Sequence, residues 1–504
     1  MTDERAKKMN SVTFAVGSLL AMSLAAVSAA YGESVPAGRP QMRLGYQLDI
    51  SRCKVPTMPT LRRIVDILAS LGYNQFQLYT EHTFAYPQHE EVWCEASPMT
   101  PDEIRRLDGY CAGKGIELVP NQNSFGHLEQ WLRHPGYNHL AEAPDGGTSY
   151  KPWFRIVPQP CCLNPTDPRS VEFVAGLYDE LFPCFRSTFV NVGCDETLEI
   201  MDDGETRIGR SAAVIREKGA HQVYVDFLNK IHALCVARGH VMMFWGDIVL
   251  SHPEFLPQVP ADAICLNWGY EANHPFAQQT AALKAAGRKF FVCPGTSAWG
   301  SLSGRTANMM CNVTNAVAAA KRNGAMGALM ADWGDGGHPN PWIVSLPGIV
   351  MLSHAVKGRS LTRAELAAEL DRVLGCRSGK ALLAYGDIYE RAKGRMSNTT
   401  ELCLLLREGK DYTRGKGVTD ETLAAALAQW RDAQSIRDLE GAPEWVRDDF
   451  ATLDLLYRAV EVRIKEPGKA NFQACFEPEY RRLWLKQNRI GGLASSIMQL
   501  FGRR

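Results

Sequence analysis

One stretch of the sequence decides the fold, Phe189-Val190-Asn191-Val192-Gly193-Cys194-Asp195-Glu196-Thr197. Its first four residues are uncharged and mostly apolar, which is typical of a buried parallel strand. The stretch then ends in two adjacent carboxylates, although burying an unpaired charge is strongly unfavourable. Either Asp195 caps a following helix with Glu196 in its first turn, or both carboxylates serve in chemistry. The surrounding sequence favours the second interpretation.

The surrounding chain alternates short apolar runs with amphipathic patterns. Eight runs are predicted as strands, at 42–49, 75–81, 116–122, 189–192, 241–245, 263–268, 289–293 and 328–333. Helical patterns follow them, at 60–71, from about residue 100, and at 168–182, 211–238, 275–286, 306–323 and 343–356. This alternation predicts a (β/α)8 TIM barrel over residues 41–357, in the α/β class. An open doubly wound sheet is the alternative architecture.

Strand patterns stop after about residue 358. Five amphipathic helices are predicted beyond it, at 361–374, 380–407, 419–439, 444–465 and 471–501. We therefore expect an all-helical C-terminal domain over residues 358–504. It contains no chemical motif, so packing, oligomerisation and covering one side of the site are its expected roles.

The composition and the N-terminus indicate an exported protein that does not bind polyanions. Lysine plus arginine and aspartate plus glutamate each number 55, so nothing favours a nucleic-acid partner. Three basic residues precede the uncharged run 11–30, which ends in small residues. This layout predicts a signal peptide over residues 1–30 and a periplasmic or secreted location. An uncleaved anchor is the alternative, although the alanine and serine content makes it a weak span.

The fourteen cysteines are scattered along the chain. Cys194, Cys265 and Cys293 lie in strand-like runs, where cysteine behaves as a small apolar residue. No CxxC pair or His/Cys cluster has the spacing of a zinc site. Most cysteines are therefore predicted to be core thiols, and the adjacent pair Cys161-Cys162 is unexplained.

Aromatic and charged residues follow the predicted strands. Four tryptophans lie at or just after strand ends, namely Trp245, Trp268, Trp299 and Trp333. A single tryptophan there would be core packing, but four at one barrel mouth predict an aromatic pocket that suits the faces of a pyranose ring. Neighbouring arginine and aspartate side chains can bind sugar hydroxyls through charged hydrogen bonds. The pattern favours a carbohydrate site.

Four motifs, in order, resemble family 20 glycoside hydrolases, the β-N-acetylhexosaminidases. They are Leu48-Asp49-Ile50-Ser51-Arg52, Phe125-Gly126-His127, Val192-Gly193-Cys194-Asp195-Glu196 and Trp333-Gly334-Asp335. The segment Cys161-Cys162-Leu163-Asn164-Pro165 makes the hexosaminidase D-like branch the most similar. The resemblance covers about residues 41–350.

This resemblance implies a retaining mechanism in which the sugar's own 2-acetamido oxygen attacks the anomeric carbon. Glu196 would be the general acid and then the general base, and Asp195 would orient the acetamido group. The substrate would be a terminal N-acetylhexosamine of a glycan, and no cofactor or metal is implied. The implied substrate-binding residues are Arg52, Glu81, His127, Trp245, Trp268, Tyr270, Trp299, Trp333 and Asp335.

Four positions depart from the family pattern, and one of them is Asn123, which stands where the classical enzymes carry an acid. Glu81-His82 stands where two acids are usual, and Asp335 replaces the commoner glutamate. The tyrosine that bonds the acetamido oxygen is expected after strand seven, where this chain has Ser297-Ala298-Trp299. Tyr270, after strand six, is the predicted substitute.

Three other functions compete with this one. A metal-dependent isomerase or lyase would use Glu81, His82, Asp195, Glu196 and Asp247 as ligands. A non-catalytic sugar-binding protein would keep the aromatic pocket alone. A retaining glycosidase with a protein nucleophile is disfavoured, because adjacent residues of one strand point apart. The preference between N-acetylglucosamine and N-acetylgalactosamine stays open.

Overall fold

Eight parallel strands form one barrel sheet in the computed structural model, which describes residues 42–52, 54–146, 159–201 and 209–502. The strands are β1 (Arg43–Asp49), β2 (Gln75–Tyr79), β3 (Glu117–Val119), β4 (Phe189–Asn191), β5 (Val241–Trp245), β6 (Ile264–Trp268), β7 (Lys289–Cys293) and β8 (Gly327–Asp332). Their order is β3-β2-β1-β8-β7-β6-β5-β4. A parallel bridge between Asn121 and Asn191 joins β3 to β4. The predicted (β/α)8 barrel is confirmed, and the open sheet is not.

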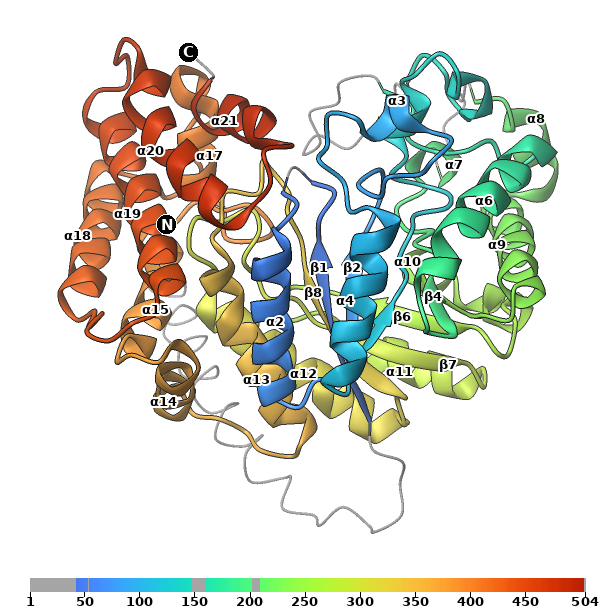
Figure 1. Cartoon of the computed structure of the whole chain (residues 1–504), viewed down its shortest axis with the longest axis horizontal. Helices are drawn as coiled ribbons and strands as arrows, with labels where there is room; N and C mark the ends of the chain where they lie inside the picture. Colours follow the sequence, from blue (N-terminus) through green and yellow to red (C-terminus); the bar gives the residue numbers. More distant parts are fainter. Residues whose placement is uncertain (1–41, 53, 147–158, 202–208, 503–504) are drawn as a thin grey trace, which may run out of the picture. The chain divides into compact units, whose positions relative to one another are not determined.

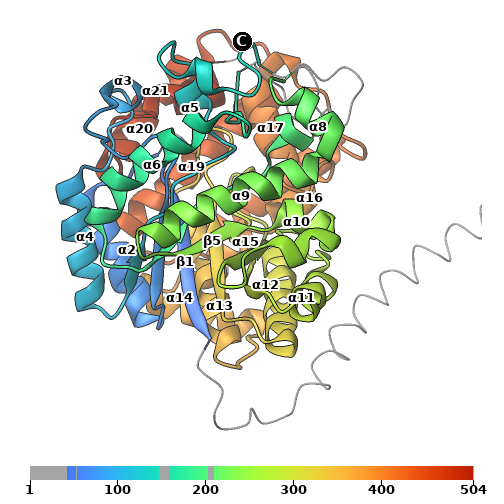
Figure 2. The ribbon, with the colours of Figure 1, turned by 90° about the vertical axis from the view of Figure 1, so that its right-hand side faces the viewer.

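Helices follow the strands on the outside of the barrel. They include α2 (Met58–Ser70), α4 (Pro101–Gly113), α6 (Pro168–Leu181), α9 (Ala220–Ala237), α11 (Phe276–Ala285), α12 (Thr306–Asn323) and α13 (Leu346–Val356). Figure 1 shows α2 beside α4, and Figure 2 shows α9 crossing beside α6. Thr100 begins α4 with a reciprocal capping box to Glu103. The helix predicted at 211–238 is broken at Gly219 (φ +84°), which separates α8 (Ala212–Lys218) from α9.

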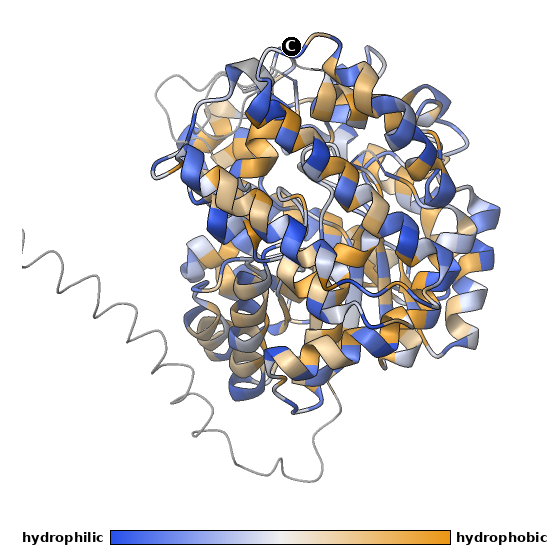
Figure 3. Ribbon diagram, turned by 90° about the vertical axis from the view of Figure 1, so that its left-hand side faces the viewer, coloured by the Kyte–Doolittle hydropathy of each residue, from blue (hydrophilic) through white to orange (hydrophobic). Residues whose placement is uncertain are grey.

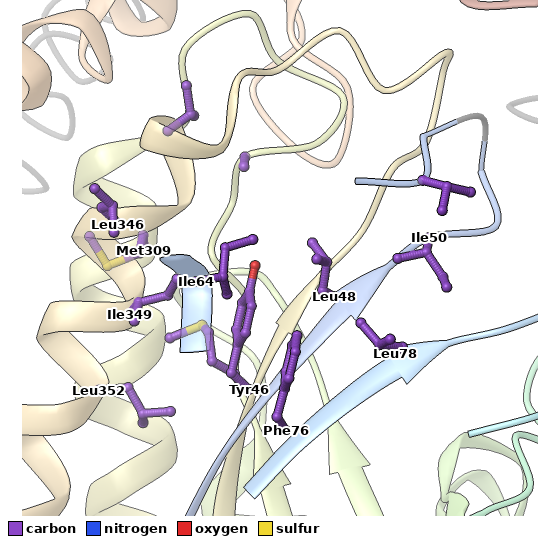
Figure 4. Close-up of a cluster of buried hydrophobic side chains, with 14 of the residues drawn as sticks. Tyr46, Leu48, Ile50, Ile64, Phe76, Leu78, Met309, Leu346, Ile349 and Leu352 are labelled. Carbon is purple, nitrogen blue, oxygen red and sulfur yellow. The ribbon is translucent and has the colours of Figure 1, made fainter. Parts of the chain in front are cut away.

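The barrel has an outer and an inner apolar layer. In the outer layer, side chains of β1 and β2 pack against α2, α12 and α13, as Figure 4 shows for Tyr46, Phe76, Ile64, Met309 and Ile349. The inner layer fills the barrel and includes Met243, Leu266, Phe291 and Leu329. This inner layer includes Trp245 and Trp333, so the packed interior ends in aromatic side chains.

The region after the barrel is helical, as predicted. Its helices are α14 (Arg363–Leu374), α15 (Gly379–Tyr385), α16 (Ile388–Ala392), α17 (Glu401–Glu408), α18 (Asp420–Ser435), α19 (Glu444–Lys465), α20 (Phe472–Gln487) and α21 (Leu493–Phe501). Both hydrophilic and hydrophobic residues run along them (Figure 3). Their buried positions recur at helical spacing, as Leu366, Leu370 and Leu374 do in α14.

Two of the predicted helices in this region are wrong in extent. The segment 380–407 contains three helices: α15 ends at Tyr385, and α16 ends where Lys393 and Gly394 adopt positive φ angles of 62° and 70°. The segment 471–501 contains two helices, because Asn488 is extended (φ −124°, ψ 160°) and Gly492 is left-handed (φ +77°). Amphipathic periodicity did not reveal these breaks between helices.

The helices after residue 358 pack directly on the barrel. Arg489 forms a salt bridge with Glu103 of α4 at 2.8 Å, and Asn488 pairs with Pro56 ahead of α2. Residues 42–504 form one compact unit, and the domain boundary near residue 357 stays a prediction. The predicted signal peptide lies outside the described residues. Within those residues, no helix combines the length and the apolar character that crossing a bilayer requires.

Candidate active site

The two carboxylates lie on a turn that follows β4. Gly193, Cys194 and Glu196 have φ angles of 69°, 67° and 44°, so the backbone is not extended there. A Cβ atom on Gly193 would lie 1.7 Å from Oδ1 of Asn123, so only glycine fits against the loop after β3. The strand alternation that would separate neighbouring side chains therefore does not apply to Asp195 and Glu196.

The loop after β3 brings His127 to both carboxylates. A Cβ atom on Gly126 would lie 2.7 Å from the carbonyl oxygen of Asp195, so this glycine permits the close approach of the two loops. His127 Nε2 lies 3.3 Å from Asp195 Oδ2 and 3.5 Å from Glu196 Oε2. The two side chains thus approach one nitrogen, and the expectation that they point apart is wrong.

Burial and charge set the protonation of this group. Burial lowers the pKa of His127, but the charges of Asp195 and Glu196 outweigh it and raise this pKa to about 10. Partial burial raises the pKa of Glu196. The positive charge of His127 lowers this pKa, and the negative charge of Asp195 raises it further. The exposed fraction of the side chain is 9% for Asp195 and 35% for Glu196. Glu196 is therefore the more accessible acid, and its pKa is shifted towards neutrality.

Arg52 is the centre of a charged group beside this pair. Its guanidinium nitrogens lie 3.4 Å from Asp49, 3.7 Å from Glu81, 3.5 Å from Asp335 and 3.2 Å from His127 Nδ1. Its guanidinium carbon also lies 5.1 Å from the ring centroids of Tyr79 and Trp333. Arg52 therefore links residues from the ends of β1, β2 and β8 to the carboxylate pair after β4 through His127.

Glu81 lies deeper than Arg52. It is buried, and its Oε1 accepts a hydrogen bond from the Tyr79 hydroxyl at 2.8 Å. Its backbone N–H donates to Ser51 at 2.7 Å, and its carbonyl accepts the Trp131 indole N–H at 2.6 Å. These hydrogen bonds hold Glu81 in place, and its carboxylate lies 3.7 Å from the Arg52 guanidinium, which it helps to position.

Aromatic side chains from five strand ends form a continuous wall. Trp333 lies 5.7 Å from Trp245 and 4.7 Å from Tyr79, measured between ring centroids. Tyr270 stacks on Trp268 at 5.1 Å and meets Trp299 edge-on at 4.8 Å. The indole N–H of Trp333 donates to the Tyr270 hydroxyl at 2.8 Å. This bond connects the group around Trp333 to the group around Tyr270. The four predicted tryptophans and Tyr270 are thus brought together.

Asp195 Oδ1 and Trp245 Nε1 are among the buried polar atoms of the site that have no hydrogen-bond partner in the described part of the chain. A buried polar group without a partner costs about 1–3 kcal/mol. One is an acceptor and the other a donor, so both can bind a polar ligand. The Tyr270 hydroxyl accepts from Trp333, which leaves its own proton for a ligand.

Asp247, an acid that follows the fifth predicted strand and that the sequence offered as a residue lining the site, a helix cap or a metal ligand, lies at the site. It begins the short helix α10 (Asp247–Ser251). Its carboxylate accepts the backbone N–H of Glu196 at 3.0 Å and the indole N–H of Trp268 at 3.3 Å. Asp247 therefore connects the left-handed backbone of Glu196 to the aromatic wall.

The helical region adds Asn398 and Arg407, which no sequence pattern singled out. Asn398 Oδ1 accepts the Trp299 indole N–H at 3.1 Å, and a Cβ atom on Gly336 would lie 2.6 Å from Arg407. Asn398 lies 99 positions after Trp299 in the sequence, and Arg407 lies 71 positions after Gly336. Covering one side of the site is thus one role of this region.

The metal alternative finds no geometric support in the described part of the chain. Three or more potential ligand atoms come within 4.8 Å of one another at a single place there, Cys161, Cys162 and Glu199. The sequence proposed a different set of ligands, namely Glu81, His82, Asp195, Glu196 and Asp247. These residues do not form such a group.

Comparisons with known proteins agree with this geometry. The chain matches the model of the catalytic domain of glycosyl hydrolase family 20 over residues 43–318. It is 24% identical over 219 residues to hexosaminidase D of Homo sapiens, covering 42% of this chain and 41% of that protein. It is 24% identical over 236 residues to a β-hexosaminidase of Akkermansia muciniphila, covering 42% and 45%. The chain thus spans less than half the length of these relatives.

Solved structures show the same fold. A chitobiase of Flavobacterium johnsoniae aligns with 92% of this chain and 78% of its own, with a TM-score of 0.53 and 16% identity. An exo-β-N-acetylglucosaminidase of Vibrio harveyi aligns with 67% of this chain and 59% of its own, with a TM-score of 0.50 and 17% identity. Because the family model matches more than half of the chain and its motifs meet at one barrel mouth, the protein belongs to glycosyl hydrolase family 20.

Proposed function

We propose that the protein is an exo-acting β-N-acetylhexosaminidase that removes terminal β-linked N-acetylglucosamine or N-acetylgalactosamine from glycans. The observation that supports this most is the buried acceptor Asp195 Oδ1, without a partner among the described residues, beside the half-exposed acid Glu196. An acetamido sugar brings the N–H that this acceptor needs. The aromatic wall then supplies apolar contact for the ring.

The reaction follows from these positions. The acetamido carbonyl oxygen attacks the anomeric carbon while Glu196 gives its proton to the leaving oxygen. Asp195 accepts the acetamido N–H and stabilises the positive charge of the oxazolinium intermediate. Glu196, now ionised, removes a proton from the water that opens this intermediate, which restores the acid. His127, held between the carboxylates and Arg52, lies 3.3 Å from Asp195 Oδ2 and orients that carboxylate.

Tyr270 and the charged group complete the proposed substrate site. The Tyr270 hydroxyl donates to the acetamido oxygen, in place of the tyrosine that other family members carry after strand seven. Arg52 and Asp335 bind the sugar hydroxyls through charged hydrogen bonds. Trp245, Trp268, Trp299 and Trp333 enclose the ring and the acetamido methyl group. The shorter Asp335 is expected to influence which hydroxyl configuration is preferred.

Hydrolysis of three aryl glycosides tests this function. The β-N-acetylglucosaminide, the β-N-acetylgalactosaminide and the β-glucoside are compared for the wild type and Glu196→Gln. We expect turnover of the acetamido sugars alone, abolished by Glu196→Gln. Equal turnover of the glucoside would contradict the mechanism and require a protein nucleophile. Binding without turnover would favour the sugar-binding alternative.

We also propose that the protein is exported and cleaved near residue 30. The basic residues ahead of the uncharged run 11–30 support this. N-terminal sequencing of protein recovered outside the cytoplasm is expected to begin near residue 31. A protein that keeps residues 1–30 would instead support a membrane anchor.

A further inference from the structure

Two adjacent thiols and a carboxylate form a cluster outside the proposed sugar site. The Sγ atoms of Cys161 and Cys162 lie 3.6 Å apart. Cys162 is buried and Cys161 is half-buried. Glu199 joins them from α7 (Leu198–Met201), which begins two residues after Glu196. One ligand atom from each of the three residues lies within 4.8 Å of the others.

The spacing of these atoms suits a tetrahedral metal ion. Two sulfur ligands at about 2.3 Å from a zinc ion, at the tetrahedral angle, lie about 3.8 Å apart. The observed 3.6 Å is close to this value. A carboxylate oxygen of Glu199 lies within 4.8 Å of both sulfur atoms. Thiolate sulfur favours thiophilic ions such as Zn²⁺ over Mg²⁺ or Ca²⁺.

We propose that Cys161, Cys162 and Glu199 form a binding site for a thiophilic divalent cation, with Zn²⁺ as the expected ion. On binding, each thiol releases its proton to water and its sulfur bonds the cation. One Glu199 oxygen is the third ligand and a water molecule the fourth. No electrons are transferred. The inference does not depend on the proposed hydrolase activity.

The surrounding hydrogen bonds indicate what the ion does. Glu199 already accepts the backbone N–H groups of Cys161 at 3.0 Å and Cys162 at 2.9 Å, which orients its carboxylate towards the thiols. The Cys161 carbonyl accepts from the N–H of Leu128 at 3.0 Å, and the Leu163 N–H donates to Phe125 at 3.0 Å.

These last two bonds join the thiol segment to residues on both sides of His127. An ion at the site therefore ties α7, just after Glu196, to the loop that carries His127. Its role is structural: it fixes the relative position of the two catalytic loops. Sequence spacing did not reveal this site, because Glu199 lies far from the cysteine pair along the chain.

Zinc titration of the reduced, metal-stripped full-length protein tests the site, with a chromophoric chelator as competitor. We expect one tightly bound equivalent in the wild type. Cys161→Ser/Cys162→Ser is expected to weaken binding by at least about 100-fold. Cys94→Ser/Cys475→Ser, which replaces two exposed thiols elsewhere, is the matched control and keeps the wild-type affinity. Glu199→Gln tests the carboxylate ligand without removing its bulk.

X-ray absorption of the zinc-loaded wild type gives a second result that needs no variant. Two sulfur neighbours at about 2.3 Å are expected. A bound ion should also raise the melting temperature of the wild type, but not that of the double serine variant. No stoichiometric zinc uptake, uptake that survives Cys161→Ser/Cys162→Ser, or a bound ion without sulfur neighbours would each overturn the proposal. So would isolation of the pair as a disulfide together with no uptake after reduction.

Discussion

At the scale of single residues, the site depends on backbone conformations that side-chain patterns do not reveal. Asp195 and Glu196 meet at His127 because the chain turns through left-handed conformations at Gly193, Cys194 and Glu196. The sequence identified the carboxylates and His127 by motif, but strand alternation gave the wrong relative orientation. Asp247 was recognisable as an acid after a strand, yet its bonds to Glu196 and Trp268 required the fold.

Replacing Tyr270 by phenylalanine tests the proposed bond to the acetamido oxygen. The variant keeps the ring that packs on Trp268 and Trp299 but loses the hydroxyl. We expect kcat to fall by about 100-fold, because a donor to a charged reaction centre is removed. Steady-state kinetics measure this, with the surface variant Tyr110→Phe as the control. A kcat within twofold of the wild type would exclude this role for Tyr270.

Replacing His127 by asparagine tests the electrostatics of the acid. Asparagine tolerates the left-handed φ of 55° at this position. The His127 charge lowers the pKa of Glu196, so its removal raises that pKa. The protonated acid then persists to higher pH, and the alkaline limb of the kcat/KM profile moves to higher pH. The exposed His252→Asn variant should keep the wild-type limb, and a downward movement in His127→Asn would contradict the account.

At the scale of elements, the strands were predictable and the breaks between C-terminal helices were not. Buried parallel strands are apolar on both faces, so the first and last residues of β5 and β7 were predicted correctly from the sequence. The helix 380–407 was predicted without interruption because its apolar spacing continues through Lys393. That unexpected break matters, since the loop after α16 contains Asn398, which holds Trp299.

Asn398→Ala tests whether this loop positions the aromatic wall. The Trp299 indole N–H loses its acceptor, which costs about 1 kcal/mol of positioning. We expect KM to rise about fivefold with kcat little changed, because Trp299 is proposed to contact the sugar ring rather than the reacting atoms. Asn398→Asp keeps the acceptor and the left-handed φ, so it should retain the wild-type KM. Equal effects of the two substitutions would argue against the hydrogen bond.

At the scale of the whole molecule, the barrel and the helices after it share an interface that includes buried charge. Asp449 of α19 accepts the backbone N–H of Ile343 at 2.9 Å and the Gln487 amide at 2.5 Å. Burial raises the pKa of Asp449 to about 6. The sequence predicted a helical region but not its attachment, because the contact between Ile343 and Asp449 joins residues 106 positions apart.

Asp449→Ala tests how much this attachment contributes to stability. Two buried donors lose their acceptor, so the free energy of unfolding should fall by about 2–4 kcal/mol. Asp449→Asn keeps one acceptor and should lose less than half as much. Urea unfolding followed by tryptophan fluorescence measures both. If the free energy of unfolding of the alanine variant falls by less than about 0.5 kcal/mol, the change is no larger than that of an ordinary surface substitution. This result would show that the interface does not depend on Asp449.

The measurement that tests the central claim most directly is kcat/KM for aryl β-N-acetylglucosaminides whose acetyl group carries zero, one, two or three fluorine atoms. Fluorine withdraws electrons from the carbonyl oxygen and weakens it as a nucleophile, while the rest of the sugar is unchanged. If the acetamido oxygen attacks the anomeric carbon, kcat/KM falls steeply with each fluorine. If the rates are independent of fluorination, the nucleophile is not the acetamido group, and the roles proposed for Asp195 and Tyr270 are wrong.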